Sequence, residues 1–164
     1  MANCCENVMN FNCTDEQFEK RVRPLLEGND HMGQRKPLTF NVLVPMPGSV
    51  YRGSVGTEER KIYGKNNWYD WSNEHWGTKW DAYDVRVDPE CVSFTTAWAP
   101  PKQWYRELAR RLQASGITAH ADYYVEGGFP GSLGGYDLSG GVLTDTEADE
   151  DFIGIYADEE EEEE

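Results

Sequence analysis

A tryptophan-rich stretch of the chain, residues 68–101, contains the side chains best suited to binding a ligand. Five of the six tryptophans lie in it. Its most informative charge is Lys79, which stands between Thr78 and Trp80. A lysine beside indole rings can lay its alkyl stem over the rings, or it can hold an anionic ligand against them. The candidate binding surface therefore consists of Trp71, Trp76, Lys79, Trp80 and Trp98.

The same aromatic residues have a second interpretation. Indole rings also cover sheet edges and the open ends of hydrophobic cores, where they bury large apolar areas. A pocket for a small ligand needs an apolar lining with a few well-placed polar groups, and this stretch could supply both. The sequence therefore leaves open whether the tryptophans belong to the core or to a binding site.

A cluster of arginines forms a candidate basic face. Arg106, Arg110 and Arg111 lie close together on a predicted helix. Glu107 lies among them, which favours an ordinary solvated helix face over an anion-binding surface. A nucleic-acid-binding protein usually carries a basic stripe free of acidic neighbours. Since no Lys or Arg block in this chain meets that condition, the sequence argues against a nucleic-acid partner.

Catalytic motifs are missing from the sequence. It contains no P-loop, no dinucleotide-binding fingerprint, no HExxH and no GxSxG. The four cysteines have no CxxC spacing and the three histidines are scattered, so we expect no metal site and no cofactor. Cys91 with His75 or His120 is only a nominal nucleophile pair. We therefore expect a protein that is not an enzyme.

The negative charge of the chain is concentrated at its C-terminus. The formal net charge is -15, of which residues 1–144 contribute -3 and residues 145–164 contribute -12. We predict a single folded domain over 1–144, followed by an acidic segment over 145–164 in which 157–164 is disordered. No apolar run approaches the roughly 20 residues that a membrane helix needs, and a signal-peptide pattern is missing. We therefore expect a cytoplasmic protein without a membrane contact.

Alternation of apolar and polar residues predicts four strands that would position the candidate site. Over 82–87, for example, Tyr83, Val85 and Val87 alternate with charged residues, so one face of the strand is apolar. The other predicted strands are 4–13, 91–98 and 117–125. Asn7 is the one polar residue on the apolar face of the first strand.

Two helices are predicted between these strands. Thr14 and Gln17 form a capping-box signature before an apolar periodicity that ends at Gly28. Pro24 should kink or break the last turn of this helix. The second helix follows Pro100, which suits a first helical turn. Its apolar stripe consists of Trp104, Tyr105, Leu108 and Leu112.

The predicted elements follow the order strand, helix, strand, strand, helix, strand. This order is typical of an α+β protein with the ferredoxin-like βαββαβ fold, in which two helices cover one face of a four-stranded antiparallel sheet. Residues 29–80 interrupt the pattern as a long aromatic-rich insertion, in which only 40–44 looks like a strand. Extra short strands are predicted near the C-terminus, as a hairpin over 129–140 and an edge strand over 152–156.

Two long motifs carry a resemblance to a known family. The runs WGTKWD at 76–81 and TAWAPP at 96–101 resemble the signature of the YubB-like ferredoxin-like domain family of phage and conjugative-plasmid proteins. The start MANCCEN and the segment VPMP at 44–47 are also similar to that family, although Cys4 stands where the family usually has tryptophan. The resemblance covers roughly residues 1–140. It implies a ferredoxin-like fold and a setting inside the host cell of a mobile element, but no mechanism.

Two functions from different classes follow. The first is a non-enzymatic accessory protein of a phage or plasmid that binds a host or element-encoded protein, and interference with host defence is one version of it. The alternative is a small-ligand or nucleotide-binding domain that uses the tryptophan-rich insertion. The oligomeric state is left open by the sequence.

Overall fold

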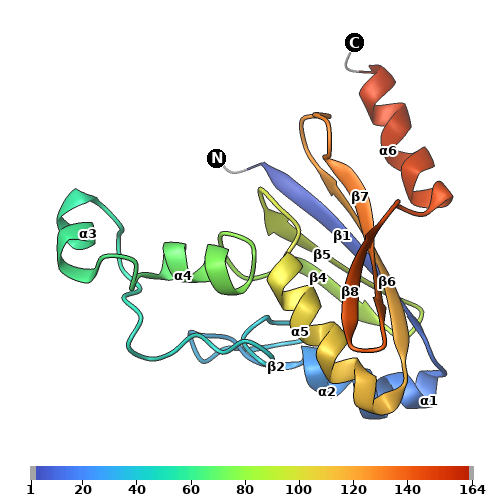
Figure 1. The fold of residues 1–164 in the computed structure, drawn as a ribbon, viewed down its shortest axis with the longest axis horizontal. Helices are drawn as coiled ribbons and strands as arrows, with labels where there is room; N and C mark the ends of the chain where they lie inside the picture. The colour runs from blue at the N-terminus through green and yellow to red at the C-terminus, as the bar shows by residue number, and fades with distance from the viewer. Residues whose placement is uncertain (1–2, 163–164) are drawn as a thin grey trace.

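The structure is a computed structural model that describes the backbone of residues 3–162 and the side chains of residues 3–156 (Figure 1). An antiparallel sheet of six strands has the order β4-β5-β1-β6-β7-β8. The chain is therefore an α+β protein, as predicted. The strands are β1 (Cys4–Asn12), β4 (Tyr83–Asp88), β5 (Cys91–Ala97), β6 (Thr118–Val125), β7 (Leu133–Ser139) and β8 (Val142–Thr146).

The first helical segment has three parts, α1 (Asp15–Gln17), η1 (Phe18–Val22) and α2 (Arg23–Leu26). Thr14 and Gln17 form the predicted capping box. The π-helical turn η1, in which the N–H of Arg23 donates to the carbonyl of Phe18, comes just before Pro24. Pro24 thus falls at the start of α2, where its missing N–H is tolerated, and the helix continues to Leu26.

Helix α5 (Lys102–Leu112) carries the predicted apolar stripe toward the sheet. Trp104, Tyr105, Leu108 and Leu112 are all buried. A short 3-10 helix, η2 (Gln113–Ser115), extends it to Gly116, which has the left-handed backbone angle φ 69° that favours glycine. In Figure 1 this helix lies across one face of the sheet.

Asn7, the polar residue on the apolar face of β1, is buried with its hydrogen-bonding groups satisfied. Its amide nitrogen donates to the hydroxyl oxygen of Thr96 at 3.0 Å, and its amide oxygen accepts from the hydroxyl of Tyr105 at 3.1 Å. These bonds join β1, β5 and α5 inside the core. A buried amide is stable there because each of these partners replaces water.

The two faces of the sheet carry different clusters. The main core lies on the face with Met9, Phe94 and Ala121, under α5 and the first helical segment. A smaller cluster of Tyr124, Ala148 and Phe152 packs on the other face, under helix α6 (Glu150–Glu162). Figure 1 shows α6 beyond β7 and β8, away from α5.

The insertion contains β2 (Gly28–Asn29), β3 (Arg35–Lys36), α3 (Thr57–Tyr63) and α4 (Trp68–His75). The first two strands pair only with each other. Residues 40–44 form turns, so the strand predicted there is wrong. Figure 1 shows α3 at the end of the molecule farthest from the sheet, with α4 between them. We call residues 51–80 the arm.

The C-terminal part differs from the predicted short strands. The hairpin predicted over 129–140 is displaced: β7 and β8 form a hairpin that extends the main sheet. The edge strand predicted over 152–156 is wrong, because these residues lie in α6. Only Phe152 is buried among 152–156, which fits a helix with one face on the sheet. The predicted disorder of 157–164 stays a prediction, since these side chains and residues 163–164 lie outside the described part.

Trp98 also departs from its predicted position. It is the last residue of the predicted strand 91–98, but β5 ends at Ala97. Trp98 has a left-handed backbone angle, φ 71°, and its side chain is 51% exposed. The change in backbone direction after Ala97 turns the indole out of the core.

The two tryptophans Trp76 and Trp98 provide a matched test of this core. Trp76 has no exposed surface, so Trp76→Ala should lower the free energy of unfolding by roughly 3–5 kcal/mol. Trp98→Ala should lower it by clearly less, about 1 kcal/mol, because about half of this residue's surface is already in solvent. Urea denaturation of both variants measures the difference, and equal losses would contradict this assignment.

Candidate functional site

Two of the predicted binding tryptophans form the base of the arm inside the core. The indole N–H of Trp76 donates to the carbonyl of Val44 at 2.8 Å. Trp71, which is 9% exposed, meets the Trp76 ring edge to face, with centroids 5.2 Å apart. The ring of Phe40 also meets this indole edge to face, with ring centroids 5.8 Å apart. Because Trp76 is fully buried, it cannot line a ligand pocket, and for Trp71 and Trp76 the core interpretation fits the structure.

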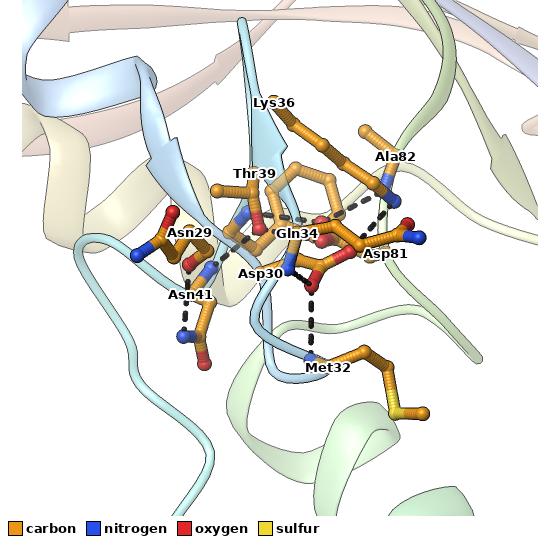
Figure 2. A network of polar contacts seen from close by, with 10 residues as sticks. Asn29, Asp30, Met32, Gln34, Lys36, Thr39, Asn41, Asp81 and Ala82 are labelled. Carbon is orange, nitrogen blue, oxygen red and sulfur yellow. Dashed lines mark hydrogen bonds and ion pairs between the residues drawn. The ribbon is translucent and has the colours of Figure 1, made fainter.

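A buried carboxylate, Asp81, connects the insertion to the start of β4 (Figure 2). It accepts hydrogen bonds from the N–H groups of Phe40 and Ala82, both at 2.9 Å, and from the hydroxyl of Thr39. Burial raises the pKa of Asp81, although these hydrogen bonds oppose the shift. Both of its carboxylate oxygens accept hydrogen bonds from the protein, so its role is structural.

A second carboxylate in Figure 2, Asp30, holds the β2–β3 hairpin together. Asp30 accepts from the N–H groups of Met32 and Gln34, both at 2.9 Å, and lies 3.1 Å from the ammonium of Lys36. Burial alone would raise its pKa, but the hydrogen bonds and Lys36 hold the pKa of Asp30 below its usual value. Both carboxylates therefore shape the support beneath the arm.

The exposed part of the predicted binding surface is a group of cations and aromatic rings at the side of the arm. The ammonium of Lys79 lies 4.6 Å from the ring centroid of Trp80 and 5.9 Å from that of Tyr69. The guanidinium carbon of Arg60 lies 5.9 Å from the same Tyr69 ring. Beside them is a cavity of about 360 Å³, which we call the Lys79 cleft. It is lined by Val55, Arg60, Trp68, Tyr69 and Lys79.

The structure thus divides the predicted surface into separate parts. Trp71 and Trp76 pack together in the core, whereas Lys79 and Trp80 form a cation–π pair on the surface. Among the described ring contacts none involves Trp98. The five predicted residues therefore do not line one common pocket.

The predicted basic face lies on the exposed side of α5. Arg110 and Arg111 both pair with Glu107, at 2.6 Å and 3.0 Å, and hydrogen bonds from these arginines lower the pKa of Glu107. Arg106 donates to the side chain of Gln103 at 3.2 Å. A groove of about 570 Å³ runs beside Arg106 and Arg110. Glu107 compensates one of the three positive charges on this face and already occupies donors of Arg110 and Arg111, so an added anion must compete with it.

A histidine between two carboxylates, on the second face of the sheet, was missed by the sequence analysis. The ring nitrogens of His120 lie 2.6 Å from Asp122 and 2.8 Å from Asp137. Asp122 also accepts the N–H of Asp149, just before α6. Burial lowers the pKa of His120, but the two carboxylates outweigh it and raise that pKa above its usual value. The His-x-Asp spacing in a strand was the available signal, but Asp137 reaches His120 only through the β6–β7 register.

The side chains that could perform nucleophilic or metal chemistry do not come together. The four cysteines are free thiols, and burial raises the pKa of Cys5 to about 12, so this thiol stays protonated near neutral pH. The ring of His75 stacks on Trp71, and neither it nor His120 contacts Cys91 among the described interactions. Within the described residues, no three His, Cys, Asp or Glu side chains form a metal-binding group.

Comparison with known proteins gives no match to a protein family, a curated protein or a solved structure. Within the part of the chain that the structure describes, no helix combines the length and apolar character needed to cross a membrane. The site's geometry is therefore the basis for the functional argument.

The His120 arrangement predicts a pH-dependent contribution to stability. Its pKa is raised on folding, so its stabilising effect should be fully present below about pH 6.5, the ordinary histidine value, and should be lost as pH rises through the folded-state pKa. His120→Gln should therefore destabilise the protein more at about pH 5.5 than at about pH 8.5. Urea denaturation at the two values measures this difference.

His75→Gln is the matched control for that experiment. The described contacts of the His75 ring are with Trp71 and involve no carboxylate. This variant removes an imidazole without a described carboxylate contact, so the difference between the two variants isolates the effect of Asp122 and Asp137. If His120→Gln cost the same at both pH values, the charged Asp122–His120–Asp137 arrangement would be wrong.

Proposed function

We propose that this protein is a non-enzymatic accessory protein that acts by binding another protein, and that the arm is its binding element. The observation that supports this proposal is that α3 contains no buried residue. On α3, Ile62 is 72% exposed and Tyr63 41%, and Tyr69 on the neighbouring α4 is 37% exposed. A projecting helix with apolar side chains in solvent has the form of a recognition element rather than of a part of the core.

The arm's own contacts hold α3 in place without burying it. Tyr63 stacks on Tyr51, with ring centroids 4.2 Å apart and an interplanar angle of 10°. Arg60 forms an ion pair with Asp70 at 2.9 Å. A seven-residue helix is not stable alone in water, so these few contacts position it while leaving its outer surface free. Such preorganisation lowers the entropic cost of binding.

The proposed setting is the cytoplasm of a host cell, in which the partner is a host or element-encoded protein. This part of the proposal rests on the resemblance to the YubB-like family.

We also propose that the first four strands of the chain's main sheet, with α1–α2 and α5, form a ferredoxin-like unit. The order β4-β5-β1-β6 supports this, because it places the first and third of these strands at the centre. The remaining strands, β7 and β8, extend one edge.

The alternative function, small-ligand or nucleotide binding, has less support from the geometry. It depended on a pocket lined by four tryptophans, and Trp71 and Trp76 are core residues. The exposed remainder, Lys79 with Trp80, lies on the arm and can equally serve a protein interface. We therefore place both exposed groups, α3 and the Lys79 cleft, in one protein-binding surface.

Variants of the arm test this proposal. Ile62→Asp places a charge where an apolar contact is expected. The amount of at least one co-purifying protein should therefore fall by about ten-fold, which corresponds to a loss of about 1.4 kcal/mol in binding free energy. Val142→Asp is the matched control, since Val142 is 60% exposed but lies on β8. The measurement is quantitative mass spectrometry of proteins bound to the intact chain and to each variant.

Photocrosslinking distinguishes a direct contact from an indirect one. A photoreactive phenylalanine analogue at Tyr63 should attach to the same protein that Ile62→Asp loses. Identical sets of bound proteins for the intact chain, Ile62→Asp and Val142→Asp would contradict the proposal that the arm is the binding element.

A further inference from the structure

We propose that the Lys79 cleft binds an acidic peptide segment, one that carries carboxylate side chains on the protein that the arm recognises. This inference rests on the proposed protein-binding function and names the chemistry of the partner. Three features of the arm support an acidic peptide: a lysine without a carboxylate partner, a local net positive charge, and aromatic rings that cations already cover.

The first feature is a lysine without a carboxylate partner. No ion pair involves Lys79 among the described residues, although its ammonium lies above the rings of Tyr69 and Trp80. Arg60 pairs with Asp70 through one terminal nitrogen, Nη1. Asp70 also accepts from the side chain of Asn67 at 2.7 Å, so it is already shared. A guanidinium has five donors, and Arg60 can therefore hold a second carboxylate beside Lys79.

The second feature is the charge of the arm compared with the rest of the chain. Residues 51–80 contain five basic and four acidic side chains, a net charge of +1, whereas the whole chain has -15. Because residues 145–164 carry -12 of this charge, an acidic segment is attracted to the arm and repelled chiefly by the C-terminal segment. Charge of this kind steers the approach of a partner and fixes its orientation more than it adds affinity.

The third feature separates a peptide from a nucleotide. Lys79 covers both the Trp80 ring and one side of the Tyr69 ring, and Arg60 lies over Tyr69 as well. Trp68 meets Tyr69 edge to face, and its indole N–H is used by the carbonyl of Gly53 at 2.8 Å. Tyr69 and Trp80 are 37% and 38% exposed, but a cation lies over each ring, so a base would have to displace Lys79 or Arg60 to stack there. Carboxylates on a flexible peptide fit these conditions better.

The test is a titration of the ¹⁵N-labelled full chain followed by NMR. The probe is a capped hexaglutamate peptide, with capped hexaglutamine and ATP in separate arms. The indole N–H of Trp68 and the amide of Lys79 report on the cleft. Hexaglutamate should shift both signals in a saturable way, hexaglutamine should not, and salt at about 500 mM should weaken the binding several-fold because it screens exposed charges.

Two variants with the same charge change show whether Lys79 is responsible. Lys79→Gln should weaken hexaglutamate binding by about ten-fold. Lys20→Gln should leave it nearly unchanged, since Lys20 lies on η1 outside the arm, pairs with Glu16 at 2.9 Å and is not part of the cleft's lining. The rest of each variant's spectrum verifies that the fold is retained.

Several results would overturn this inference. They are the lack of a saturable shift with hexaglutamate, equal losses in both variants, and tight ATP binding at the cleft in place of the peptide. Its failure can be told apart from failure of the proposed function. A partner protein that is lost with Ile62→Asp but retained fully with Lys79→Gln would support the arm as the binding element and contradict an acidic segment in the cleft.

Discussion

Burial of Trp76 is the interaction on which the rest of the structure depends. Its ring fills the space between the insertion and the sheet, where Phe40 contacts it and in turn contacts Phe94 and Trp104. Its indole N–H satisfies a carbonyl of the insertion, that of Val44, so the ring is anchored by a hydrogen bond as well as by packing. A fully buried indole contributes several kcal/mol, of the order of 3–5. Ordering a long insertion costs far more entropy than one indole supplies, so the packing of Phe40 and Trp71 around Trp76 is needed as well.

The anchoring divides the arm into two regions with different properties. Its base, with Trp71 and Trp76, belongs to the core and has the core's stability. Its outer part, α3, has solvent around it and is positioned by the Tyr51–Tyr63 stack, the Arg60–Asp70 ion pair and the contact of Arg60 with the Tyr69 ring. The buried carboxylates Asp30 and Asp81 fix the turns beneath the base, so the direction of the arm is set by satisfied hydrogen bonds. A rigid support below a lightly packed element is a suitable arrangement for binding.

Sequence patterns correctly predicted the strands and helices in which the local order of apolar and polar residues decides which side chains face the core. The strand at Cys4–Asn12 and the helix at Lys102–Leu112 belong to this class, because their apolar residues face one core. Trp98 does not, since a left-handed backbone turn redirects its side chain and alternation carries no signal for that turn. The pairing of His120 with Asp137 depends on register between strands, and the split between core and surface tryptophans depends on tertiary packing. Both lie beyond local patterns.

The central claim is that the arm is anchored at its base and free at its tip. Amide hydrogen exchange of the unbound full chain measures this most directly. The account predicts that the amides of Arg60 and Gly64, bonded within and at the end of α3, exchange through local opening with little protection. The amides of Trp71 and Trp76 should exchange only slowly, close to the rate set by global unfolding. Equal protection along the whole arm would contradict the claim, because α3 would then be part of the core.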